Sequence, residues 1–170
     1  QPGPVVAHRT SPTNIGMALL AGLAAHDFGF IGTGRLLERT GLTLTTMQRL
    51  PRHRGHFYNW YDTQTLQPLA PLYVSSVDSG NLAGHLLTLY PGLLELIDAP
   101  IFSTQVLRGL LDTLDLLHDT LDRTRVAALE PLRRQLDDAL AESPSTTSAV
   151  GALLGELRQA AHALAATLET

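Results

Sequence analysis

Apolar residues recur along most of this chain at intervals of three and four, the spacing that places side chains on one face of an α-helix. The pattern is strongest where Val106, Leu110 and Leu114 follow one another. The segments that carry it are residues 12–28, 33–50, 76–90, 103–121, 125–141 and 148–168. We therefore predict an all-α protein of antiparallel helices joined by short links.

Several helix ends are marked by residues that favour them. Ser11 followed by Pro12 predicts a helix start, because the serine hydroxyl can accept a hydrogen bond from a free backbone N–H and proline fits the first helical position. Pro51 predicts the end of the second helix. Pro91 and Gly92 predict that the third helix stops near Tyr90.

The helical period is lost between residues 51 and 75. Pro68 and Pro71 interrupt the backbone there, and the alternation from Phe57 to Tyr61 allows at most a short strand or an extended loop. A loop this long within a compact domain is usually functional or disordered, and its aromatic residues argue against disorder. We therefore expect one long, ordered loop with a functional role.

The composition restricts the class of protein. The 170 residues predict a single helical domain over residues 1–170, and cysteine is absent, so thiolate metal sites and disulfides are excluded. The net charge of −4 and the scattered arginines argue against nucleic acid as a partner. No apolar run reaches the roughly 18 residues of a membrane span. Charged residues make up only 16%, which suggests a fragment whose surface is partly covered by other domains.

The long loop contains an aromatic cluster in the stretch RGHFYNWYDT. The chain has nine Phe, Tyr and Trp residues, and four of them lie in this stretch: Phe57, Tyr58, Trp60 and Tyr61. The polar residues beside them are Arg54, His56, Asn59 and Asp62. Sugars present C–H faces that stack on aromatic rings and hydroxyls that bind carboxylates, amides and guanidinium groups. The cluster therefore predicts a sugar or small-ligand site, and the alternative is that its rings fill a gap beneath the loop.

A second group of polar residues surrounds the predicted start of the third helix. Ser75, Ser76, Asp78 and Ser79 lie where free backbone N–H groups and the helix dipole favour an anion. We therefore expect Asp78 to stay ionised, which suits it to hold sugar hydroxyls or to act as a base. The alternative is an ordinary helix-capping aspartate.

The histidines give little support for a metal site. His53, His56 and His85 could be drawn together as three ligands, but the first two lie in or beside an irregular loop, whereas zinc ligands usually stand on a defined framework. We predict no metal site and no cofactor.

At the level of motifs, the chain resembles the cyclic β-1,2-glucan synthase family. The stretches that carry the resemblance are PVVAHRTSPTNIG, AAHDFGFIGTGRLLERT and RHRGHFYNWYDTQTLQPLAPLYVSSVDSGNLAGHLLTL. They look like the segment that precedes the glucoamylase-like region of these bacterial enzymes. The resemblance covers residues 4–97, whereas residues 98–170 share only helical character.

The resemblance implies a fold and a context. The middle region of such enzymes is expected to be an α/α toroid that transglycosylates linear β-1,2-glucan into a ring, in a protein that also carries a glycosyltransferase region and a cellobiose-phosphorylase-like region. The chain would then be a fragment of that toroid, in a cytoplasmic domain of an inner-membrane protein. Its expected partners are a β-glucan oligosaccharide and the remaining domains of the parent chain.

The resemblance also places residues at the sugar groove. It implies substrate contacts for Tyr58, Trp60, Asp62, Asp78 and Asn81. Together with the rest of the aromatic cluster, the predicted substrate-binding residues are Arg54, His56, Tyr58, Trp60, Tyr61, Asp62, Asp78 and Asn81.

Catalysis by the chain alone is not predicted. Glycosidic chemistry needs two carboxyl groups about 5 to 9.5 Å apart, and only Asp62 and Asp78 are flanked by sugar-type residues. The glutamates expected to act as acid and nucleophile have no matching motif here, so the fragment should be inactive. One alternative is a structural connector between the transferase and glucoamylase-like regions; another, weaker one is an autonomous glycoside hydrolase. We also predict self-association through an exposed apolar face.

Overall fold

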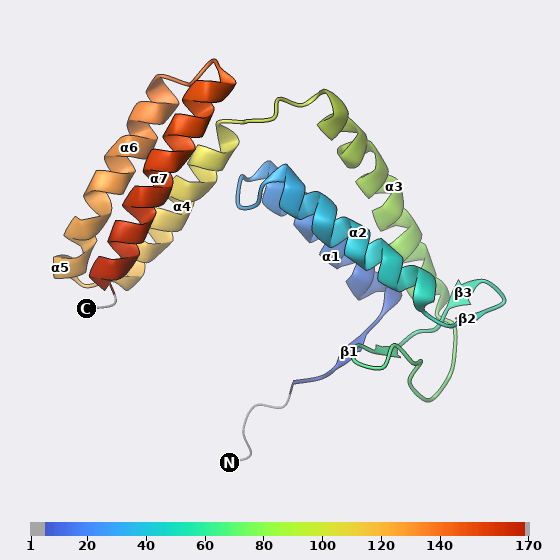
Figure 1. Ribbon diagram of the computed structural model, residues 1–170. Coiled ribbons are helices and arrows are strands. Elements are labelled where there is room, and N and C mark those ends of the chain that lie inside the picture. The colour runs from blue at the N-terminus through green and yellow to red at the C-terminus, as the bar shows by residue number, and fades with distance from the viewer. Residues whose placement is uncertain (1–5, 169–170) are drawn as a thin grey trace, which may run out of the picture. The chain divides into compact units, whose positions relative to one another are not determined.

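The computed structural model describes residues 6–168, apart from the side chains of residues 123 and 124. The prediction of an all-α fold is confirmed: helices make up most of the chain, and the strands in the described part form two short antiparallel pairs (Figure 1). Contacts divide the chain into two compact units, Gln1–His26 with Thr33–Ala99 and Asp27–Gly32 with Pro100–Thr170. The single domain within a larger toroid stays a prediction.

Three helices form the body of the first unit: α1 (Pro12–Asp27), α2 (Thr33–Arg49) and α3 (Ser76–Asp98). Their shared core contains Leu19 from α1, Met47 from α2, and Leu82 and Leu89 from α3. Phe57 of the long loop packs against the same cluster. The loop is therefore attached to the helices by apolar contact as well as by its ends.

Three of the short strands lie in the long loop, and the fourth lies before α1. Strand β1 (Arg9–Thr10) pairs with β4 (Tyr61–Asp62), with Arg9 opposite Asp62 and Thr10 opposite Tyr61. Strand β2 (Arg52–His53) pairs with β3 (His56–Phe57) as a hairpin. The β1–β4 pair joins the segment before α1 to the middle of the loop, which fixes the loop against the start of that helix.

Serine hydroxyls mark the starts of two helices, as predicted. Ser11 Oγ accepts a hydrogen bond from the backbone N–H of Asn14 (3.2 Å), and Ser75 Oγ accepts one from the backbone N–H of Asp78 (3.1 Å). Each bond satisfies a backbone donor that has no partner within its helix. Both predicted helix starts are therefore confirmed: α1 begins at Pro12, and α3 begins at Ser76, within the predicted range from Ser76 to Asp78.

The predicted end of the third helix near Tyr90 is wrong. Helix α3 continues through Pro91 to Asp98. Proline removes the bond that residue 91 would donate to the carbonyl of Leu87, but both residues are exposed, so water can satisfy that carbonyl. Leu89 and Leu93 lie in or against the core on either side of Pro91, and their burial favours a continuous helix.

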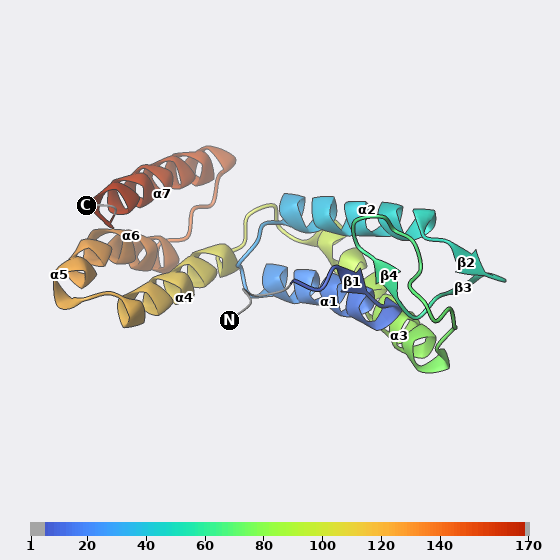
Figure 2. The ribbon, with the colours of Figure 1, turned by 90° about the horizontal axis from the view of Figure 1, so that it is seen from below.

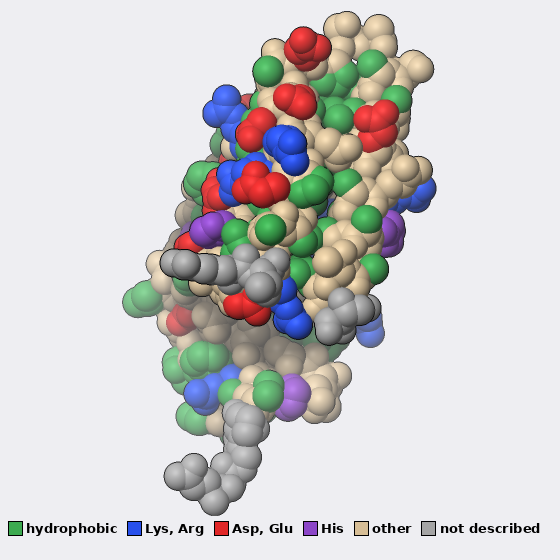
Figure 3. Space-filling model, turned by 90° about the vertical axis from the view of Figure 1, so that its left-hand side faces the viewer, with side chains coloured by type: hydrophobic (Ala, Val, Ile, Leu, Met, Phe, Trp, Pro, Cys, Tyr) green, Lys and Arg blue, Asp and Glu red, His purple; other side chains and the backbone are tan. Residues whose placement is uncertain are grey.

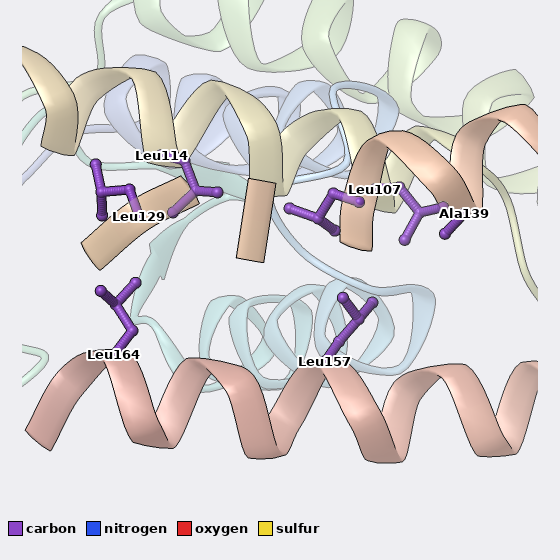
Figure 4. Packing of buried hydrophobic residues seen from close by; sticks show 7 residues of the cluster. Leu107, Leu114, Leu129, Ala139, Leu157 and Leu164 are labelled. Atoms are coloured by element: carbon purple, nitrogen blue, oxygen red, sulfur yellow. The ribbon is translucent and has the colours of Figure 1, made fainter. Parts of the chain in front are cut away.

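Helices α4 (Gln105–Thr120), α6 (Glu130–Ala141) and α7 (Thr147–Leu168) form the second unit. A short helix, α5 (Arg123–Val126), and a 3₁₀ turn at Ala127–Leu129 precede α6, where the sequence predicted one continuous helix. In Figures 1 and 2, α6 lies beside α4. Leucines of α4 and α7 point toward the space between the helices (Figure 4).

A tight turn completes this unit. Gly29 has a φ of +77°, and a Cβ built on it would lie 2.0 Å from the carbonyl oxygen of Gln105. A Cβ on Gly109 would lie 2.5 Å from the carbonyl oxygen of Gly29. Only glycine at both positions allows the backbones to approach this closely.

The surface carries mixed charges. On the face drawn in Figure 3, Arg side chains lie among Asp and Glu rather than in a patch of one sign. Among the helices of the described residues, none has the length and apolar character that a membrane crossing requires.

Candidate functional site

The hairpin β2–β3 presents two of the predicted sugar-contact residues at its tip. Arg54 and Gly55 form its two-residue turn with positive φ values of 50° and 88°, as expected for a turn that matches the twist of the flanking strands. The side chains of Arg54 and His56 are exposed. Both are therefore accessible, but Arg54 lies in the turn and His56 in the strand beside it, away from the helices.

Tyr61 fixes the loop from beneath. Its side chain is fully buried, and its hydroxyl donates a hydrogen bond to the Pro51 carbonyl (2.7 Å) and accepts one from the Tyr58 N–H (2.7 Å). Burial raises the pKa of Tyr61, although the bond from Tyr58 and the positive charge of Arg52 act in the opposite direction. The structure therefore shows Tyr61 as an internal anchor of the loop.

Trp60 and Tyr58 are both partly exposed. The guanidinium carbon of Arg9 lies 4.9 Å from the centre of the Trp60 ring, in a cation–π contact. Tyr58 lies beside His53 and Tyr61, with ring centres 6.3 and 6.4 Å away. The two rings can therefore be reached by a ligand, although Arg9 covers part of Trp60.

Asn59 occupies the centre of the site and is buried. The partners around it set the orientation of its amide: Nδ2 donates to Asp78 Oδ2 (2.8 Å), while Oδ1 accepts from Trp60 Nε1 (2.6 Å) and from the Tyr73 hydroxyl. The opposite orientation would face acceptors with the oxygen and donors with the nitrogen. The backbone N–H of Asn59 also donates to the Tyr73 carbonyl (2.9 Å).

Asp78 links this network to the helices. Thr13 Oγ1 of α1 donates to Asp78 Oδ1 (2.7 Å) and accepts from Asn81 Nδ2 (3.1 Å). Burial alone would raise the pKa of Asp78, but hydrogen bonds from Ser75, Thr13 and Ser11 outweigh that effect, so the pKa of Asp78 is lowered. Asp78 is therefore ionised at neutral pH.

Asp62 stabilises a turn. Its Oδ1 accepts hydrogen bonds from the backbone N–H groups of Gln64 (2.8 Å) and Thr65 (2.7 Å). These bonds, that of Thr65 foremost, lower the pKa of Asp62. Asp62 also borders a cavity of about 270 Å³ whose lining includes Ile15 and Met47.

The two aspartates therefore have different surroundings. Asp78 bonds to side chains of α1 and the loop, whereas Asp62 bonds to the backbone of its own turn. A general acid needs a raised pKa, and the pKa of each carboxyl is lowered. The geometry suits both to orient neighbouring groups. A catalytic role for Asp62 and Asp78 was only a minor alternative in the sequence, and it stays untested.

The three histidines considered as metal ligands are in different places. His53 and His56 face each other across the hairpin, whereas His85 packs on Gly16 of α1. Within the described residues, no group of three or more His, Asp or Glu side chains is placed to hold a metal ion.

No motif in the sequence marks the residues that connect the site. No motif distinguishes three of them, Arg9, Thr13 and Tyr73. The sequence indicates Asn59 only as one of several polar neighbours of the aromatic rings. One signal was available: SPT at residues 11–13 and SSVD at residues 75–78 are both helix starts rich in hydroxyl groups. Two such starts brought together would form a polar cluster.

Comparison with known proteins connects this helical chain and its polar loop with a glucan-synthesising enzyme. No family model matches the chain. Over 155 residues, it is 43% identical to a cyclic β-(1,2)-glucan synthase, NdvB of Rhizobium meliloti (strain 1021). The match covers 88% of this chain and 5% of the relative, so the chain corresponds to a small part of that protein.

The resemblance found in the motifs is therefore confirmed: the chain is homologous to one segment of a cyclic β-1,2-glucan synthase. A match over 88% of the chain cannot be confined to residues 4–97. It extends into the C-terminal helices, where the motifs predicted only helical character.

Proposed function

We propose that this chain supplies part of the glucan-binding groove of a cyclic β-1,2-glucan synthase, as the N-terminal part of an α/α toroid. The observation that carries this proposal is the placement of Trp60: its ring is partly exposed, its indole N–H is hydrogen-bonded to Asn59, and Asn59 is hydrogen-bonded to Asp78. An aromatic ring held beside polar groups is the arrangement that sugar recognition requires. Homology to a glucan synthase supports the substrate class.

The groove would use the accessible residues. Trp60 and Tyr58 would stack on sugar rings, and Asn81, which is exposed on α3, would bind hydroxyls. Arg54 and His56 at the hairpin tip could contact a longer oligosaccharide. Catalytic carboxylates would come from other parts of the parent protein, so this chain alone would bind without hydrolysing.

Trp60 is the only tryptophan, so its fluorescence reports on this site. We expect linear β-1,2-gluco-oligosaccharides to change the emission saturably in the millimolar range, corresponding to about 4 kcal/mol. A β-1,4 series of equal lengths should have no effect. Asn81→Ala should weaken the response several-fold, whereas Asn14→Ala, an equal change at an exposed position of α1 outside the network, should not.

A structural connector is the competing function, and two observations favour it: Arg9 covers part of Trp60, and Tyr61 is fully buried. If the emission does not respond to the β-1,2 series and acrylamide quenches Trp60 poorly, the aromatic loop only fills space. The proposed sugar groove would then be wrong.

The outer side of α3 supports the predicted self-association. Four large apolar side chains are exposed at intervals of three and four residues: Leu87 (77%), Tyr90 (67%), Leu94 (44%) and Ile97 (75%). Such a stripe matches the spacing of helix–helix seams. Sedimentation of the chain should therefore show association that Leu94→Glu abolishes, and a wild-type monomer at high concentration would contradict it.

A further inference from the structure

We propose that Asn59 is a positioning residue, whose amide couples the carboxylate of Asp78 to the indole ring of Trp60. The orientation of the Trp60 ring, which would contact the ligand, then depends on the carboxylate of Asp78, although the two are not bonded directly. The inference deepens the proposed function and rests on it for the use of the site. The coupling itself can be measured without any sugar.

The chemistry of the amide carries the inference. Asn59 uses Nδ2 as a donor toward Asp78 and Oδ1 as an acceptor from Trp60 and Tyr73. A carboxylate at this position could accept from Trp60 but could not donate to Asp78, and an apolar side chain could do neither. Because Asn59 is 6% exposed, water cannot readily replace a lost partner.

Asp78 can act as a fixed reference because other bonds hold it. Its Oδ1 accepts from Thr13 on α1, and its backbone N–H donates to the capping hydroxyl of Ser75. The other oxygen, Oδ2, accepts from Asn59. Since both carboxylate oxygens have protein partners, Asp78 is better suited to orient the loop than to bind a ligand directly.

Trp60 needs such a reference. Its backbone is held, because its carbonyl accepts from the N–H of Leu69 (2.9 Å), but the backbone does not fix the side-chain rotamer. The side chain has two constraints of different strength: Arg9, which is exposed, lies over the ring, and buried Asn59 accepts from Nε1. The buried hydrogen bond is the more directional of the two.

The test uses the single indole N–H of the chain, which gives one indole signal in a ¹⁵N–¹H correlation spectrum. We would compare its hydrogen exchange in Asp78→Ala and Asp78→Asn in the full chain. Both substitutions remove the charge, but the asparagine oxygen can still accept from Asn59. We expect exchange about tenfold faster in Asp78→Ala, or about 1.4 kcal/mol, and within about threefold of wild type in Asp78→Asn.

Two further variants complete the test. Asn59→Ala should accelerate exchange at least as much as Asp78→Ala, and Asn14→Ala is the control that should not. If Asp78→Ala does not fold, as circular dichroism would show, Asp78→Ser replaces it, because the serine side chain, whose oxygen lies one bond closer to the backbone than the carboxylate oxygens, is too short to reach Asn59.

The inference is overturned if Asp78→Ala exchanges like the Asn14→Ala control, or if Asp78→Asn is as fast as Asp78→Ala. Failure of the sugar titration leaves these exchange rates unchanged, so the two proposals fail separately. If the coupling is confirmed and the sugar does not bind, the network positions Trp60 for a structural purpose.

Discussion

The aromatic loop of the first unit and the leucine core of the second are stabilised in different ways. In the loop, the buried side chains of Asn59 and Tyr61 make hydrogen bonds through single atoms to defined partners. In the second unit, the buried cluster consists almost entirely of leucines from α4, α6, α7 and the 3₁₀ turn before α6 (Figure 4). The stability of the loop should therefore depend on whether single atoms donate or accept hydrogen bonds, whereas the stability of the core should depend on side-chain volume.

The largest effect is expected in the leucine core. Leu136 is fully buried, so Leu136→Ala should lower the free energy of unfolding by about 4 kcal/mol, because it removes buried methyl groups and leaves a cavity. Leu136→Met keeps the volume and should lower it by less than about 1.5 kcal/mol. Urea unfolding followed by circular dichroism measures both.

The matched control for this pair is Leu116→Ala on α4, where the side chain is exposed and the change should be within about 0.5 kcal/mol. If Leu136→Met were as damaging as Leu136→Ala, the core would depend on side-chain shape rather than volume, and the comparison with the loop would lose its basis.

The next effect concerns the loop. Asn59→Asp hardly changes the shape, yet it replaces a donor with a carboxylate beside Asp78 Oδ2. We expect the free energy of unfolding to fall by about 3 kcal/mol at neutral pH, because a buried hydrogen bond is replaced by repulsion between like charges. Unfolding followed by Trp60 fluorescence reports on this unit. If Asn59→Asp lowered the free energy of unfolding by less than Leu136→Met does, the loop would not depend on the Nδ2 atom of Asn59.

The sequence predicted the helices well because their periodicity is local information. Ser11 and Ser75 located two helix starts through their hydroxyls, and the all-α fold followed from the leucine spacing. The helix end predicted at Pro91 was wrong because the effect of a proline depends on whether the carbonyl that it leaves unbonded faces water. Here that carbonyl belongs to Leu87, which is exposed, and exposure is set by the packing of the helices rather than by neighbouring residues in the sequence.

The candidate site was predicted only in part. Asp78 and Trp60 were both selected, but the bonds between them run through Asn59 and on to Thr13, residues far apart in the chain. Tyr61 was grouped with the ligand-contact residues, since a tyrosine that anchors a loop and one that faces a ligand have the same sequence signal. Distinguishing them required the burial of the side chain.

A smaller effect is expected where α1 crosses α3. A Cβ on Gly16 would lie 2.3 Å from Nδ1 of His85, so Gly16→Ala should lower the free energy of unfolding by about 2 kcal/mol. Gly84→Ala is the matched control on α3: nothing lies within 4 Å of its Cβ, and it should stabilise by up to about 1 kcal/mol. Equal effects at the two glycines would contradict the close α1–α3 contact.

The smallest effect follows from the ionisation of Asp78. Because the pKa of Asp78 is lowered in the folded chain, the ionised form stabilises the fold above the unfolded pKa of about 3.9, and this stabilisation is lost as the pH falls through the folded pKa. Asp78→Asn should therefore be less stable than wild type at neutral pH by about 1 kcal/mol or less, since the carboxylate is partly exposed. The difference should shrink below about pH 4, measured by urea unfolding followed by Trp60 fluorescence. A constant difference from pH 7 to pH 3 would mean that the loss of stability comes from the amide group that replaces an acceptor oxygen, and that the ionisation of Asp78 does not stabilise the loop.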